Sequence, residues 1–171
     1  MNWLDLVLIL VIGGAVVLEM VRGIGRAAFD ALLLYAALWG ADAAALPLAA
    51  RVHLADGAAV NHADIYALLL VTFGVAALGV ARFLYGMTQF DAGMFEALLG
   101  LGAGAATGMI AAHGIVRALA MADPTGTAGA ATVAGSFVGH EMLTFPTYHA
   151  VMDTVTGATS YRRELPDLGG K

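Results

Sequence analysis

The chain has no cysteine and few charged residues for its length. With no cysteine among 171 residues, disulfides, cysteine-based zinc sites and thiol nucleophiles are excluded. Charged residues make up only 12% of the sequence, about half the usual share in a soluble domain. The formal net charge of −5 argues against a nucleic-acid partner, which selects for a basic surface. These shortages favour a protein whose surroundings are a lipid bilayer.

Four long apolar runs fill most of the sequence, which is 60% hydrophobic with a mean hydropathy of +0.82. Each run is close to the roughly 20 residues that a helix needs to cross a bilayer. We therefore predict an all-α integral membrane protein with about four transmembrane helices in a membrane domain at 1–123. The predicted spans are about 3–21, 27–46, 64–82 and 96–118.

The segments between these runs set the expected boundaries. Asp5 stands where a signal peptide would carry basic residues, which predicts a retained first span. Two glycines and two arginines at 22–26 predict an interfacial turn, in which Glu19 is placed to pair with Arg22. Pro47 is expected to close the second span, and the polar stretch 51–64 is expected to form a loop.

The last part of the chain, 124–171, predicts an extramembrane segment with a short amphipathic helix. This helix is expected to begin near Pro146, because proline is accepted in a first helical turn. Apolar residues then recur at helical spacing, which suits a helix on the membrane surface or against the spans. They are Tyr148, Val151, Met152 and Val155.

Glycines recur every fourth residue in the last apolar run. Gly100, Gly104 and Gly108 follow this step, and Ala112 continues it, so all four lie on nearly one face of a helix. Such small residues let two membrane helices pack closely, as in GxxxG pairs. The partner helix is left open: it is a span of this chain, such as the one ending at Arg82, or it belongs to another membrane protein or a second copy.

Five arginines border the predicted spans. Arg22, Arg26 and Arg82 lie on one side, and Arg51 and Arg117 border the other. The excess of positive charge on cytoplasmic loops then places both termini outside the cytoplasm. The three arginines on the first side either bind lipid phosphate or extend to the membrane interface around their apolar stems.

Several short motifs follow one another along the chain: Trp3-Leu4-Asp5 near the start, Arg22-Gly23 with Arg26, Leu98-Leu99-Gly100 with Gly104 and Gly108, Ser136-Phe137-Val138, and Met142-Leu143. In this order and spacing they resemble the colicin V production protein family. The resemblance implies a small, multi-pass protein of the bacterial inner membrane, with both termini in the periplasm on the charge argument. Members are linked to export of a peptide bacteriocin, a form of toxin biosynthesis, and to envelope integrity.

The chain departs from that family at two points. Phe95-Glu96 stands where members usually have an Asp-Arg pair, and Thr107 stands where members often have arginine. Both changes remove a basic residue near the third connector. They predict a divergent member with a partner of its own.

Three polar residues fall within predicted spans: Asp30, Asp42 and His113. Ionisable groups at such positions indicate either a polar pathway or interfacial anchors. Asp30 is four residues after Arg26, which permits an ion pair along the helix. Asp30 and Asp42 are twelve residues apart and do not share a helix face. His113 is expected either to bond a neighbouring helix or to relay protons.

Two groups of residues have ligand types that suit a metal. His140-Glu141 lacks a second histidine at position 144, and His149 and Asp153 lie beyond Pro146. A loop group converges only if the loop folds back on itself; it comprises His53, Asp56, His62 and Asp64. We predict neither group to bind a metal, and we predict no cofactor and no catalytic residue.

Two functions remain. The first is a non-enzymatic inner-membrane protein, acting in export or envelope maintenance or as an accessory helix-packing subunit of a larger membrane complex. The alternative is a transporter or channel component that uses Asp30, Asp42 and His113. The two differ in whether these groups share an interior cavity.

Overall fold

The computed structural model describes residues 2–88, 92–122 and 129–145, and all regular structure in these ranges is helical. The helices are α1 (Trp3–Arg22), α2 (Ile24–Ala49), α3 (Ala58–Thr88), the 3-10 turn η1 (Gly93–Phe95), α4 (Glu96–Ala122), α5 (Gly129–Ala134) and α6 (Phe137–Thr144). Four of them, with η1 counted into α4, are long and apolar enough to cross a membrane. The predicted all-α class with four such helices is confirmed. The predicted amphipathic helix after Pro146 lies outside the described residues.

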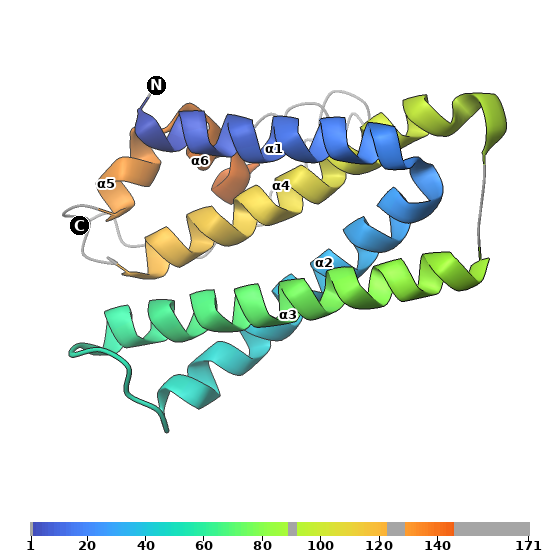
Figure 1. The fold of residues 1–171 in the computed structure, drawn as a ribbon. Helices are drawn as coiled ribbons and strands as arrows, with labels where there is room; N and C mark the ends of the chain where they lie inside the picture. Colours follow the sequence, from blue (N-terminus) through green and yellow to red (C-terminus); the bar gives the residue numbers. More distant parts are fainter. Residues whose placement is uncertain (1, 89–91, 123–128, 146–171) are drawn as a thin grey trace, which may run out of the picture.

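The four long helices form two antiparallel pairs (Figure 1). α1 lies along α4, and α2 lies along α3, while α2 also contacts α4 and so joins the pairs. The two short helices α5 and α6 cover the end where α1 begins. Many large apolar side chains face outward, including Leu10 at 65% exposure, Val75 at 67% and Phe83 at 66%. This surface is consistent with a multi-pass membrane protein.

The glycines of α4 lie directly against the backbone of α1. A Cβ atom added to Gly104 would lie 2.8 Å from the Cα of Val16, and one added to Gly108 would lie 2.7 Å from the Cα of Ile12. At Gly100 the nearest atom would be the carbonyl oxygen of Glu19, at 2.7 Å. These three glycines, here called the glycine stripe, therefore pack against α1 rather than the span that contains Arg82.

Ala112 extends the same face into the apolar core at the other end of α1. It is fully buried with Leu4 and Leu8 of α1, and Met142 of α6 closes the cluster. A second core lies between α2 and α3 around Tyr66, and Ala118 and Met121 of α4 pack against it. α4 therefore contributes to both cores and joins the two helix pairs.

The turn between α1 and α2 falls within the predicted stretch 22–26 and is tighter than expected. α1 ends at Arg22, α2 begins at Ile24, and Gly23 alone makes the corner with φ +86°. This left-handed conformation favours glycine. Gly25 is already helical and buried.

Two predicted boundaries are wrong. Pro47 does not close α2, which continues to Ala49; only two helical residues follow the proline, so the lost hydrogen bond is confined to the last turn. The stretch 51–64 is a loop only up to Gly57, because α3 begins at Ala58.

Asn61 explains why α3 begins early. Its side chain is 3% exposed and lies inside the loop, where its Oδ1 accepts a hydrogen bond from the N–H of Leu54 at 2.6 Å. Its Nδ2 donates to the carbonyls of Ala49 and Val52. These bonds tie the end of α2 and the loop to the first turn of α3, so Asn61 does its bonding from a helical position rather than from a loop.

The start of α1 is tied to α6. The Asp5 carboxylate, fully buried, accepts hydrogen bonds from the Ser136 hydroxyl at 2.7 Å and the Val138 N–H at 2.9 Å. Asn2 caps α1 and donates to the carbonyl of Thr132 at 2.6 Å. Polar side chains at the start of α1 therefore join it to α5 and to the start of α6.

We expect Gly104→Ala to destabilise the fold by about 1–3 kcal/mol, because the added Cβ would clash with the backbone of Val16. A backbone atom cannot move aside by a change of rotamer. Gly102→Ala is the matched control on the same helix, since no atom lies within 4 Å of its Cβ position. Unfolding in mixed micelles by increasing SDS measures both. Equal stability of the two variants would contradict the close α1–α4 contact.

Candidate functional site

Four charged side chains meet at the corner of α1 and α2. Arg22 Nη1 lies 3.0 Å from Glu19 Oε1 and 3.6 Å from Asp30 Oδ2, and Arg26 Nε lies 3.6 Å from the same Asp30 oxygen. The structure thus contains the Arg26–Asp30 and Glu19–Arg22 pairs that the spacing suggests. It adds a link between the two helices through Arg22, which the spacing alone does not indicate.

The two acids of this group are buried and the two arginines are partly exposed. Glu19 is 2% exposed and Asp30 is fully buried, whereas the Arg22 and Arg26 side chains are 30% and 23% exposed. The glycine stripe explains the burial of Glu19, because a Cβ on Gly104 would lie 3.1 Å from the Glu19 Cβ. The acids therefore lie beneath the arginines and support them from inside.

Hydrogen bonding within this group is incomplete. Among the described residues, one hydrogen bond joins members of the group, from Arg22 Nη1 to Glu19 Oε1 at 3.0 Å. The two contacts to Asp30, at 3.6 Å, are too long for N–H···O bonds. Both oxygens of Asp30, the second oxygen of Glu19 and the Arg26 Nε are buried and have no hydrogen-bond partner among the described residues. Coulomb attraction between the arginines and Asp30 therefore supplements this one hydrogen bond, and most guanidinium donors have no acceptor within the described part of the chain.

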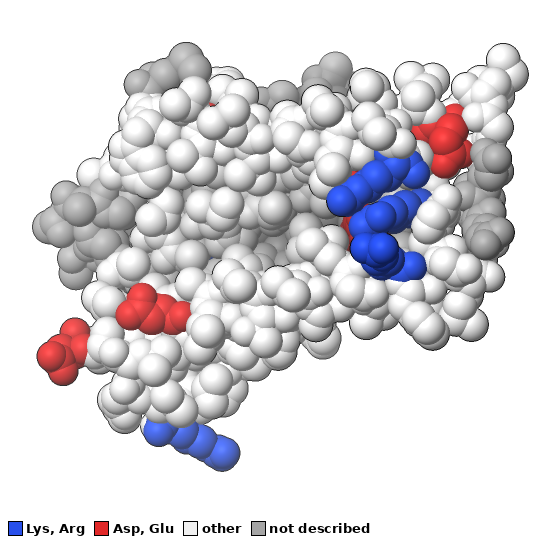
Figure 2. Space-filling model, viewed as in Figure 1, with Lys and Arg blue, Asp and Glu red and all other residues white. Residues whose placement is uncertain are grey.

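Arg82 belongs to the same end of the molecule. Gly40 of α2 lies against Phe73 of α3, and Gly74 lies against Leu34, so the antiparallel register brings Arg82 level with the first turns of α2. Figure 2 shows basic side chains gathered over the end where α1 meets α2. We call Arg22, Arg26 and Arg82 the basic patch.

Asp42 is paired with a residue from a different span. Arg117 of α4 donates from Nε to Asp42 Oδ1 at 2.9 Å. The two side chains are 39% and 38% exposed, and they lie within two turns of the ends of α2 and α4. They line a cavity of about 170 Å³ with His113 and, from α2, Tyr35, Leu38 and Trp39. The sequence predicts Arg117 only as a residue that borders a span, although its position one helical turn after His113 indicates that the two share a helix face.

His113 is held by the segment that follows the spans. Its Nδ1 lies 2.9 Å from the carbonyl oxygen of Met142, and its ring stacks on Phe145 with centroids 6.1 Å apart. This is the bond to a neighbouring helix that one interpretation expects. Asp30 lies at the α1–α2 corner and does not line the cavity of Asp42 and His113.

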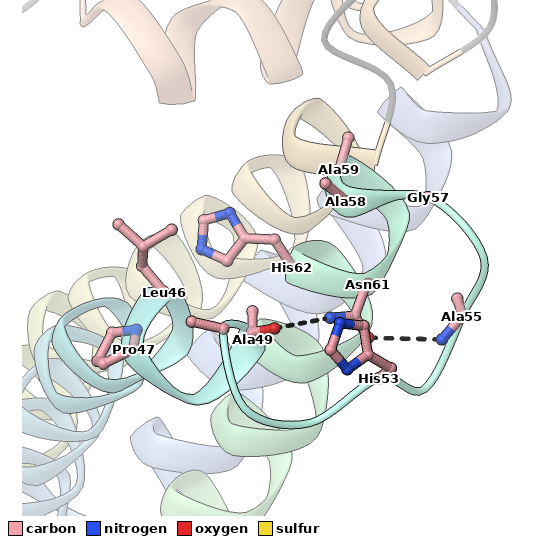
Figure 3. Close-up of a pocket in the computed structure, with 11 residues that line it drawn as sticks. Leu46, Pro47, Ala49, His53, Ala55, Gly57, Ala58, Ala59, Asn61 and His62 are labelled. Carbon is pink, nitrogen blue, oxygen red and sulfur yellow. Dashed lines mark hydrogen bonds between the residues drawn. The ribbon is translucent and has the colours of Figure 1, made fainter.

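A larger cavity, of about 720 Å³, lies at the loop between α2 and α3 (Figure 3). Small apolar residues line most of it, and His53, Asn61 and His62 are its polar members. Asp56 and Asp64 do not line it. Among the described residues no three potential ligands gather as a metal site would require. His149 and Asp153, suggested as partners of His140 and Glu141, lie outside the described residues.

The two departures from the family pattern lie at different places. Thr107 is buried at 7% exposure and donates to the Ala103 carbonyl within α4. Glu96 accepts a hydrogen bond from the Ala92 N–H at 2.7 Å, and its carboxylate lies over Gly23, beside the basic patch.

No protein-family model, curated protein or solved structure matches the chain. The class that the fold defines is a multi-pass membrane protein with four apolar helices.

We expect Asp42→Asn and Arg117→Gln to be coupled. Each single change leaves one charge without its partner inside a span, so the double variant should be more stable than the sum of the single effects predicts. A coupling of roughly 0.5–3 kcal/mol, typical of contacting residues, is expected in a double-mutant cycle of SDS unfolding. Strict additivity would contradict the pair.

Proposed function

We propose that this chain is a small, non-enzymatic protein of the bacterial inner membrane, similar to colicin V production proteins, that serves as an accessory subunit of a larger membrane complex in export or envelope maintenance. The motifs from Trp3 to Met142 support the family resemblance, and the arginines on one side support an orientation with periplasmic termini.

One observation carries the accessory role: the exposed Asp42–Arg117 pair. Charged groups in membrane spans are costly and normally face the protein interior or a polar cavity. Here more than a third of each side chain is uncovered on the flank of α2 and α4. Contact with another membrane protein would remove this cost.

The side chains around the pair support the same role. Trp39 is 71% exposed and Tyr35 is 60% exposed, and both line the cavity of the pair. Trp, Tyr and Arg are enriched among the residues that contribute most to protein–protein binding. The glycine stripe is occupied by α1, so a partner that used the stripe would have to displace that helix. The flank of Trp39 therefore suits a partner better.

We expect a photo-crosslinking amino acid at position 39 to join the chain to a different membrane protein in intact cells. Position 10 on α1 is the matched control, because Leu10 is similarly exposed, at 65%. Crosslinked species are identified by mass spectrometry after gentle detergent purification. Lipid adducts alone, a homodimer alone, or the same protein captured from position 10 would each overturn the accessory role.

The alternative, a transporter or channel component, is favoured by a different observation. Asp42, Arg117 and His113 line one cavity. A polar pathway requires several such groups to face a shared space. Asp30 is not among them, so a pathway through this cavity would use only two of the three suggested residues.

Cysteine labelling separates the alternative from the accessory role. The natural chain has no cysteine, so each single-cysteine variant carries one thiol. If a water-filled pathway exists, positions 42 and 113 will react with a membrane-impermeant thiol reagent at rates near that of position 51 in the loop. Position 71, where Val71 is 65% exposed on α3, is the lipid-facing control. Rates at 42 and 113 equal to that at 71 would eliminate the pathway.

A further inference from the structure

The basic patch holds many hydrogen-bond donors that the protein does not use. Each guanidinium carries five N–H donors in a planar fork. For Arg22, Arg26 and Arg82 together, one hydrogen bond to another described residue is found, from Arg22 to Glu19. Arginines at this density and exposure are suited to an oxyanion with several acceptor oxygens.

The buried acids give the patch a fixed shape. Glu19 holds one nitrogen of Arg22, and Asp30 attracts both Arg22 and Arg26 from below. Since both acids are at most 2% exposed, they present no carboxylate at the surface above them. The outward side of the patch is therefore cationic (Figure 2), with Glu96 beside Gly23 at its border.

The patch also lies at one end of the predicted spans, which meets the phosphates of the headgroup layer when these helices cross a bilayer. Arg22 is the last residue of α1, Arg26 is in the first turn of α2, and Arg82 is six residues before the end of α3. Helix ends of membrane spans meet the headgroup layer. Arginine binds phosphate through two parallel N–H···O bonds, which lysine does not reproduce.

We propose that Arg22, Arg26 and Arg82 form a binding site for the phosphodiester of an anionic membrane lipid. Glu19 and Asp30 are positioning residues that hold the guanidinium groups without touching the lipid. In the orientation proposed above, the site faces the cytoplasmic leaflet, where anionic lipids attract basic groups. This inference is independent of the accessory role, which concerns the opposite ends of α2 and α4.

The test uses the full chain in nanodiscs made of phosphatidylcholine alone or of phosphatidylcholine mixed equally with phosphatidylglycerol. Native mass spectrometry measures which lipid stays bound to the protein after the protein is released from the nanodisc. We expect preferential retention of phosphatidylglycerol, weakened about fivefold by each Arg→Gln change in the patch. Arg51→Gln, at the other end of α2, is the control and should leave retention unchanged.

Two further arms keep the result unambiguous. Arg82→Gln breaks no ion pair among the described residues, so it tests the site even if changes at Arg22 or Arg26 unfold the corner. Inorganic phosphate is titrated against the bound lipid: failure to displace it supports a lipid site. Displacement at millimolar phosphate, equal retention of the two lipids, or an equal effect of Arg51→Gln would each overturn the proposal.

Discussion

The close contact between α1 and α4 is the constraint on which the rest of the structure depends. Three glycines one turn apart bring the two backbones so near that no Cβ fits between them. In a bilayer there is little hydrophobic gain from joining two apolar helices, so association relies on such dense packing. The contact fixes α1 lengthwise on α4 and thereby sets where every polar group of α1 lies.

The charged groups follow from that placement. The glycine stripe packs against Glu19 at one end of α1, and the Glu19 carboxylate is directed toward Arg22. At the other end of α1, Asp5 reaches the N-terminus of α6. The contact between uncharged residues of α1 and α4 therefore determines where the acids of α1 are buried and which residues they pair with.

The fold could be predicted from the sequence to the level of four apolar helices, because hydropathy and length depend only on local composition. The Arg26–Asp30 pair could also be predicted, because residues four apart on a helix are neighbours. The Asp42–Arg117 pair was not, because it joins residues 75 positions apart and depends on the rotation of α2 against α4. Asn61 shows a further limit: a polar residue read as loop becomes the buried organiser of a helix start once its partners are in place.

The link between Asp5 and Ser136 has a consequence for the order of events during synthesis. α1 is synthesised before α6, yet the two donors to Asp5 Oδ1 lie 131 and 133 residues later. Until α6 has been made, Oδ1 lacks these donors, while Oδ2 accepts a hydrogen bond from the nearby Asn2 N–H at 2.8 Å. The start of α1 therefore completes its buried hydrogen bonds only after the chain has been made through α6, although α1 itself is made much earlier.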